Sequence, residues 1–364
     1  MKLFYFANIR FPTERAHGVQ IAKMCEAFLD SGAEVVLVIP NRTIMINKNP
    51  YEYYGVKSNF KITRIGNPEN PHFKVGYWIS YAKFVSRIPF YCFKNKADVY
   101  YSRDESIVFI LSLFGVKAVW EAHGWKDSIF IRYFLNKIEK IVCITNIAKE
   151  RFVESGVPER KIIIAPDGVD ESLLISDIDK TSARGKLGLS VQGTFVFYIG
   201  FLDEWKGYRT LLQCADTLAS QGIKVVIIGG IVEKLQKEFP KAIFLGFVPY
   251  KELAMVQAAA DVLVIPNSAK SIVSTDYTSP LKLFAHMASG RPIVASDLPS
   301  LREVLNEEMA YFFEPDSPES LVQTIQYVLA HPDEANEKAR KALVKVEEYT
   351  WDKRAKKILK FIRP

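Results

Sequence analysis

Two lysines in the second half of the sequence stand where they could bind an anion. Lys206 ends the turn 198–207, which follows an apolar run and precedes a helix expected over 208–220. Lys282 belongs to the first turn of a helix expected over 279–290. A helix start offers free backbone N–H groups and a positive dipole end, and a lysine there is unfavourable unless an anion is bound. Lys206 is the best single candidate for a phosphate contact, with a merely solvated lysine as the alternative.

The segment 279–290 has the start and stop signals of a short helix. Ser279 is a good N-cap, Pro280 suits the first helical position, and Gly290 can take the left-handed conformation that follows a helix. The polar loop 271–278 precedes it. A well-capped core helix that binds nothing is the alternative to an anion site.

Two histidines of the first half are expected at the carboxyl edge of a sheet. His123 follows the apolar run that ends at Glu121, and His17 lies in the loop between the first strand and a helix predicted over 20–31. Gly18 would let the backbone approach a ligand closely at that helix start. Histidines are more often structural, so both interpretations stay open. The single glycine disfavours a nicotinamide-dependent oxidoreductase, whose loop carries Gly-x-Gly-x-x-Gly.

The elements that must position these residues form an α/β pattern, because short apolar runs alternate with amphipathic stretches of helix length. With 364 residues, 49% of them hydrophobic, the chain can build two cores. We predict a first domain over 1–175, a linker between 166 and 190, a second domain over 190–345 and a helix over 350–364 that packs back on the first domain. The expected strands, six for each sheet, are 3–8, 34–39, 99–102, 117–121, 140–145, 161–165, 194–200, 224–229, 242–245, 262–266, 292–295 and 310–313.

The cysteines and the chain start predict a cytoplasmic protein. The four cysteines stand singly and form no metal-ligand spacing, so neither a metal nor a disulfide is expected. The apolar start is too short for a signal peptide, and no apolar run reaches the about 18 residues that span a bilayer. The net charge of +7 does not by itself indicate a nucleic acid partner. Any membrane contact is expected to be peripheral, on the inner face.

One stretch, 42–96, is strongly basic and aromatic. It holds ten Lys and Arg residues against Glu52 and Glu69 only. Such a surface could bind anionic lipid headgroups, and the alternative is a helix whose rings fill the core. The interleaved aromatic residues are Phe73, Tyr77, Trp78, Tyr81, Phe84, Phe90, Tyr91 and Phe93.

Together these segments resemble the retaining glycosyltransferases of family 4, also called glycosyl transferases group 1. The resemblance covers nearly the whole chain and is strongest in YIGFLDEWKG, LGFVPYKELAMVQAAADVLVIPN and SPLKLFAHMASGRPIVASDLPSLREVL. The strings AHGVQ, EAHG and APDGVD are less specific. The resemblance implies the GT-B architecture, in which two Rossmann-like domains face each other across a cleft and a final helix returns to the first domain.

The family activity implied is transfer of a hexose-type sugar from a nucleotide-diphosphate sugar to a lipid-linked or polysaccharide acceptor, with retained configuration and without metal or cofactor. Carried over by position, His123 lies near the reacting sugar and His17 is on the acceptor side. Lys206 contacts the diphosphate, the amides of 279–282 cradle it, and Val248 lies near the base. The implied donor residues are Gly18, Lys206, Val248, Ser279, Pro280, Leu281 and Lys282.

Three positions depart from the family pattern. Phe201 replaces a usual arginine, and the Glu-x7-Glu pair maps to Tyr277 and Ala285. Loss of the second carboxylate should weaken donor binding roughly 10- to 150-fold. A divergent donor site, low activity, a non-catalytic member and an engineered substitution all fit these departures. The competing functions are a non-catalytic GT-B protein that binds glycans, lipids or a partner chain, and a sugar-nucleotide epimerase.

Overall fold

The computed structural model describes the whole chain except residues 58, 70–73, 126–128, 175–177, 231 and 364. Phe73 of the basic aromatic stretch, and 175–177 of the predicted linker, therefore lie outside the described residues. The chain divides into two compact units, which we describe separately. Unit 1 comprises Met1–Pro166 and Trp351–Pro364, and unit 2 comprises Asp167–Thr350.

Unit 1 is built on a parallel sheet of seven strands in the order β3-β2-β1-β4-β5-β6-β7. Six of them were predicted, and β3 was missed. It pairs with β2 at the edge of the sheet, has no fully buried residue and contains only two strongly apolar residues, so it lacks the signal of a buried strand. The strands are β1 (Lys2–Phe6), β2 (Glu34–Arg42), β3 (Lys61–Glu69), β4 (Val99–Ser102), β5 (Ala118–Ala122), β6 (Lys140–Cys143) and β7 (Ile162–Ile164).

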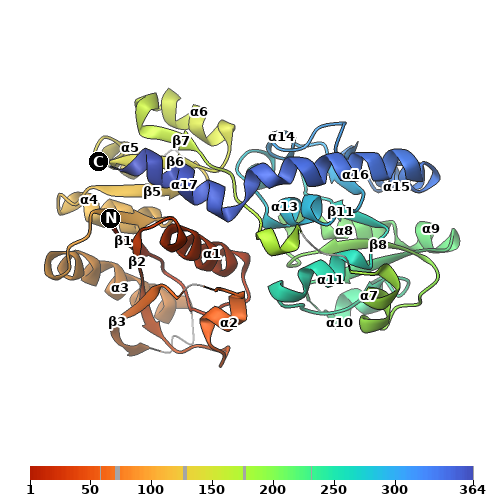
Figure 1. Ribbon diagram of the computed structural model, residues 1–364, viewed down its shortest axis with the longest axis horizontal. Helices are drawn as coiled ribbons and strands as arrows, with labels where there is room; N and C mark the ends of the chain where they lie inside the picture. Colours follow the sequence, from red (N-terminus) through yellow and green to blue (C-terminus); the bar gives the residue numbers. More distant parts are fainter. Residues whose placement is uncertain (58, 70–73, 126–128, 175–177, 231, 364) are drawn as a thin grey trace. The chain divides into compact units, whose positions relative to one another are not determined.

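The helices of unit 1 include the last one of the chain, which packs against α1, as the blue and dark red ribbons in Figure 1 show. The apolar face of this helix is buried. The helices are α1 (Ala16–Asp30), α2 (Pro50–Tyr54), α3 (Lys74–Lys94), α4 (Glu105–Leu113), α5 (Ile129–Leu135), α6 (Asn146–Glu154) and α17 (Trp351–Ile362), with a 3-10 turn at η1 (Glu159–Lys161).

Helix α1 begins four residues earlier than predicted, so His17 and Gly18 lie in its first turn instead of a loop. Gly18 is required there by packing. A Cβ atom at this position would lie 2.3 Å from the Tyr54 hydroxyl oxygen and 2.5 Å from a Thr13 methyl carbon.

Unit 2 contains a six-stranded parallel sheet in the order β10-β9-β8-β11-β12-β13, which is the strand order of the Rossmann fold. The strands are β8 (Thr194–Ile199), β9 (Ile223–Ile228), β10 (Ile243–Phe244), β11 (Val262–Ile265), β12 (Ile293–Ser296) and β13 (Tyr311–Phe313). The α-helices are α7 (Lys180–Lys186), α8 (Tyr208–Gln213), α9 (Ala215–Ser220), α10 (Glu233–Glu238), α11 (Leu253–Ala258), α12 (Ile272–Thr275), α13 (Leu281–Ala288), α14 (Pro299–Arg302), α15 (Pro318–Ala330) and α16 (Pro332–Val346). The 3-10 turns are η2 (Glu171–Leu173), η3 (Glu204–Lys206), η4 (Tyr250–Glu252) and η5 (Glu347–Tyr349).

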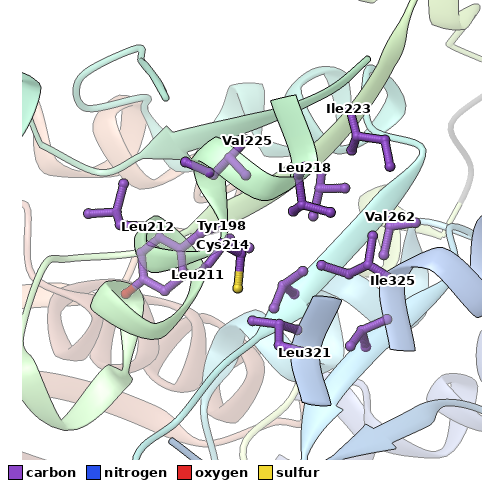
Figure 2. Packing of buried hydrophobic residues seen from close by; sticks show 14 of the residues in the cluster. Tyr198, Leu211, Leu212, Cys214, Leu218, Ile223, Val225, Val262, Leu321 and Ile325 are labelled. Atoms are coloured by element: carbon purple, nitrogen blue, oxygen red, sulfur yellow. The ribbon is translucent and has the colours of Figure 1, made fainter. Parts of the chain in front are cut away.

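One face of this second sheet packs against α8, α9 and α15. Figure 2 shows Val225 and Val262 of the strands gathered with Leu218 and Ile325 of the helices, and all four are buried. A single helix expected from 208 to 220 is in fact two, since α8 ends at Gln213 and α9 starts at Ala215. The core anchors the turn that carries Lys206, because α8 starts two residues after it.

Candidate functional site

The carboxyl edge of the unit 2 sheet presents polar groups where the strand order reverses, between β8 and β11. Ligands of open α/β sheets bind outside the strand ends at such a point. Asn267 follows β11 and is fully buried, and neither polar atom of its side-chain amide has a hydrogen-bond partner among the described residues. Buried amides are normally paired, so Asn267 marks this edge as a place for a polar ligand.

Lys282 is the second residue of α13, and its ammonium is buried without a hydrogen-bond partner in the part of the chain that the structure describes. Its Nζ atom lies 4.8 Å from the centre of the Tyr198 ring. Burial, and then repulsion from Lys206, hold the pKa of Lys282 well below its usual value. A buried ammonium without an anion is costly, so an anionic ligand would stabilise it strongly.

Lys206 ends the 3-10 turn η3, and its Nζ atom lies 2.8 Å from Oδ2 of Asp203. The same ammonium is 5.6 Å from the Phe201 ring centre and 5.2 Å from that of Trp205. Gly207 follows with φ 65°, and a Cβ atom there would lie 1.7 Å from the carbonyl oxygen of Pro266. The glycine therefore lets the Lys206 turn pack directly on the end of β11.

The predicted start of α13 needs a correction. Pro280, not Ser279, occupies the N-cap position, and no side chain caps the helix. The Ser279 hydroxyl instead accepts a hydrogen bond of 2.9 Å from the backbone N–H of Asp167. Leu281 is the first helical residue, so the first N–H groups of the helix lie at 281–283. Gly290 adopts φ 62°, the left-handed conformation predicted for it.

The positions that depart from the family pattern carry aromatic or apolar side chains in place of charged ones. The ring centres of Phe201 and Phe247 are 6.2 Å apart, and Val248 is half-buried against the apolar cluster behind them. Ala285 is buried in an apolar cluster with Phe284, and Tyr277 is buried as well. Where the family has an arginine and two glutamates, this unit has two aromatic rings and an apolar methyl group.

In unit 1, Glu121 and His123 lie at the end of β5 and form a buried polar network. Glu121 is completely buried, and its Oε1 atom is 2.6 Å from Nε2 of His123 and 2.6 Å from the amide nitrogen of Gln20. The Tyr101 hydroxyl donates to the other carboxylate oxygen, and Arg354 of α17 completes the network at 3.2 Å.

This network fixes the protonation of its members. Burial alone would raise the pKa of Glu121, but Arg354 and the hydrogen bond from His123 outweigh it and hold that pKa well below its usual value. An ionised carboxylate only accepts hydrogen bonds, so the Nε2 atom of His123 carries the donated proton. The ring is thereby oriented as in a carboxylate–histidine pair.

A pocket of about 710 Å³ lies at the carboxyl edge of the unit 1 sheet, near β1 and β4, between which the strand order reverses. His17 lines it, but His123 is not among its lining residues. Burial, with Arg103, Arg15 and then His123, lowers the pKa of His17 to about 4, so this imidazole is neutral at neutral pH.

Four arginines line this pocket, namely Arg10, Arg15, Arg42 and Arg103, and none of them was predicted as a site residue, although Arg42 is the first residue of the basic stretch 42–96. Arg42 is the last residue of β2, and Arg103 follows β4 directly. A search for cations at predicted strand ends, as made for Lys206, would have found Arg103 next to the expected strand 99–102.

No cluster of three or more metal-ligating side chains occurs among the described residues. In that same part of the chain, no helix has the length and apolar character needed to cross a membrane.

Comparisons with known proteins agree with this architecture. The family model described as Glycosyltransferase Family 4 matches residues 17–173, and the one described as Glycosyl transferases group 1 matches residues 193–331. A curated relative, D-inositol 3-phosphate glycosyltransferase of Corynebacterium urealyticum, is 24% identical over 245 residues, which are 61% of this chain and 56% of the relative. The match thus spans little more than half of that relative's length.

Solved structures share the fold over nearly the full chain. Sucrose-phosphate synthase of Thermosynechococcus elongatus superposes with a TM-score of 0.77 at 17% identity, covering 99% of this chain and 97% of that one. HepE of Anabaena, solved in complex with UDP and glucose, gives 0.76 at 14% identity, covering 99% and 98%. Two parallel α/β sheets of the GT-B type, with a family match in each half, establish that this chain belongs to the family 4, group 1, glycosyltransferases.

Proposed function

We propose that this protein transfers a hexosyl group from a nucleotide-diphosphate sugar to a lipid-linked or glycan acceptor, with retained anomeric configuration. The bond between the sugar C1 and the diphosphate oxygen breaks, the oxygen of an acceptor hydroxyl bonds to C1, and the proton of that hydroxyl passes to the departing diphosphate. The departing nucleoside diphosphate carries the negative charge that the protein must stabilise. Unit 2 is assigned to the donor and unit 1 to the acceptor.

The observation that carries this proposal is the buried ammonium of Lys282, which has no hydrogen-bond partner among the described residues and repels Lys206. The two lysines lie at one sheet edge, and although Asp203 pairs with Lys206 in the free protein, a diphosphate could contact both ammonium groups. The amides at the start of α13 add hydrogen-bond donors. Positive groups aimed at a developing charge commonly supply the largest share of catalysis.

The donor proposed first is a UDP-hexose, since HepE, of similar fold, was solved with UDP and glucose. Phe247 is 44% exposed and lies beside Phe201, so the pair offers an aromatic surface next to Val248 for the base. The apolar setting of Ala285 leaves the ribose without a carboxylate at that position. His123, oriented by Glu121, is the proposed contact to the reacting sugar.

A peripheral contact with an anionic membrane is proposed for α3. Its buried face holds Phe84 and Ile88, whereas Trp78 is 63% and Phe90 is 69% exposed. The aromatic rings of the basic stretch therefore divide between core and surface, and neither interpretation of the stretch accounts for all of them. An amphipathic helix with exposed rings and nearby lysines suits an interface of lipid headgroups. The exposed apolar residues of α3 are Val75, Tyr77, Trp78, Ile79, Phe90 and Phe93.

Thermal unfolding and calorimetry with UDP, GDP and ADP test the donor assignment. A nucleotide at 100 times its Kd should stabilise the protein by about 2.7 kcal/mol. Lys206→Ala should weaken binding of that nucleotide about tenfold or more, because a charge-assisted contact to phosphate is lost. Lys241→Ala, an exposed lysine of the same unit, is the matched control and should bind normally.

The same experiment separates the alternatives. If none of the three nucleotides binds to the unaltered chain and one of them binds to and stabilises Ala285→Glu, the missing carboxylate accounts for the lost donor binding. If neither responds, the transferase proposal is wrong and a non-catalytic binding protein is the remaining interpretation. Normal nucleotide affinity in Lys206→Ala would remove Lys206 from the site.

A further inference from the structure

The pocket of unit 1 is lined by more cationic than anionic side chains. Four arginines line it, and its one acidic lining residue is Asp104, whose carboxylate accepts hydrogen bonds from other groups. The Asp104 carboxylate accepts hydrogen bonds from the Tyr81 hydroxyl at 2.7 Å and from the Ser106 backbone at 3.0 Å. Among the residues that the structure describes, no carboxylate forms an ion pair with Arg10, Arg42 or Arg103.

Arg42 is a buried member of this group, and one of its donor atoms is unpaired among the described residues. Only 4% of the residue is exposed, and its Nη2 atom is buried without a hydrogen-bond partner within the described part of the chain. Its Nε atom donates to the Ser80 hydroxyl at 2.9 Å, and the guanidinium lies 4.7 Å from the centre of the Tyr77 ring. The side chain is thus held in place by α3 while one donor stays unused.

The other cations of the pocket point to the same conclusion. Burial lowers the pKa of Arg42 and Arg10 lowers it further, while Tyr77 and Glu69 act in the opposite direction without reversing the shift. Arg103 is fixed by a 2.7 Å hydrogen bond from its Nη1 atom to the Gln20 amide oxygen. Since His17 is neutral, the positive charge resides on guanidinium groups. Planar guanidinium groups bind phosphate through paired hydrogen bonds, and a buried donor left unpaired is costly.

We propose that this arginine pocket, formed by Arg10, Arg42 and Arg103, binds a phosphate group carried by the acceptor. The proposal rests on the assignment of unit 1 to the acceptor, and it narrows the acceptor to phosphate esters. The phosphate belongs either to a water-soluble sugar or polyol phosphate or to the headgroup of a lipid. The free volume of about 710 Å³ accommodates a phosphorylated headgroup-sized molecule.

The test uses the full-length protein and two probes, sn-glycerol 3-phosphate in solution and phosphatidic acid in phosphatidylcholine vesicles. Calorimetry in phosphate-free buffer should show binding of at least one probe. Arg42→Gln should weaken that binding at least tenfold, and Arg10→Gln, at a position that is not buried, should do so as well. Arg160→Gln, an exposed arginine of the same unit, is the control and should bind as the natural chain does.

The outcomes separate this proposal from the donor assignment, which is read from nucleotide binding. Binding of glycerol 3-phosphate would identify a soluble source of the phosphate, whereas binding only to phosphatidic acid vesicles would identify a lipid source. If neither probe binds, or if the arginine variants bind a probe as tightly as the unaltered chain does, the proposal of a phosphate site in this pocket is wrong. A loss of nucleotide affinity in Arg42→Gln equal to the loss of probe affinity would assign the pocket to the donor and also overturn it.

Discussion

Arg354 and Glu121 are separated by 233 residues in sequence, yet the Nη2 atom of Arg354 lies 3.2 Å from Oε1 of Glu121 inside unit 1. Arg354 also donates from Nε to the carbonyl oxygen of Pro166 at 2.8 Å. The last helix of the chain therefore supplies the cation that neutralises a carboxylate of the first sheet. Through Glu121, the same cation helps to orient His123.

The first prediction is that Glu121→Gln destabilises unit 1. The change leaves the buried Arg354 guanidinium without its counter-charge, which costs about 3 kcal/mol. Thermal or denaturant unfolding measures the loss. In the double variant with Arg354→Met no charge is left unpaired, so the two losses should be less than additive by about 1 kcal/mol or more. Strict additivity would contradict the coupling of this pair.

The second prediction concerns the role of His123 in transfer. His123→Ala should lower kcat about 10²-fold, the scale expected for loss of one group that acts on the transition state, while nucleotide affinity stays within twofold. The measurement is nucleoside diphosphate release during turnover, alongside calorimetry with the nucleotide alone. His331→Ala, an exposed histidine of unit 2, is the control. An undiminished kcat in His123→Ala would exclude His123 from the reaction.

The sequence predicted those features that depend on a local pattern. Buried parallel strands such as β1 and β8 are continuous apolar runs, and both are where the alternation of strands and helices placed them. The edge strand β3 was missed because none of its residues is fully buried and it has no continuous apolar run. The break between α8 and α9 escaped too, since the apolar positions continue across it.

The sequence could identify individual candidate residues, but it could not predict the partners that surround them in the fold. Lys282 was a candidate because a lysine at a predicted helix start is a local signal. That its ammonium is buried without a partner depends on packing from distant segments, including Tyr198. The network of Glu121 required a residue from the last helix, and a pattern search within one segment has no access to such a pairing.

The third prediction is that Lys282→Met stabilises the free protein and removes nucleotide binding. Methionine fills a similar volume without a charge to bury, so the melting temperature in the absence of ligand should rise by several degrees. Stabilisation by the nucleotide that the natural chain binds should be lost. Lys270→Met, an exposed lysine, serves as the control for a simple gain of apolar character. A destabilised variant would show that the ammonium is satisfied in the free protein.

The fourth prediction is a loss of stability in mild acid. Burial lowers the pKa of His286 to about 3, with a further effect of Lys282, and the pKa of His17 is lowered to about 4. Between pH 6.5 and 4.5 both histidines bind protons in the unfolded chain but not in the folded one. The free energy of unfolding should then fall by up to about 1.4 kcal/mol per pH unit for each histidine.

Melting temperatures from pH 7.5 to 4.5 measure this effect, which should be slight above pH 6.5. The imidazole of His286 lies 2.9 Å from the amide nitrogen of Gln257, and His286→Gln keeps a polar group there. This variant should lose roughly half of the pH dependence. An unchanged slope would mean that His286 also titrates normally in the folded protein.

The fifth prediction is that the exposed rings of α3 bind vesicles. Trp78→Ser and Phe90→Ser should each reduce cosedimentation with vesicles of phosphatidylglycerol without lowering the melting temperature, because neither ring is buried. Val344→Ser, an exposed apolar residue of unit 2, is the control. Binding should fall as salt rises, since exposed charges are screened over about 8 Å at physiological ionic strength. Equal binding to neutral vesicles would contradict the preference for anionic lipid, and no effect of either substitution would show that α3 is an ordinary solvated helix.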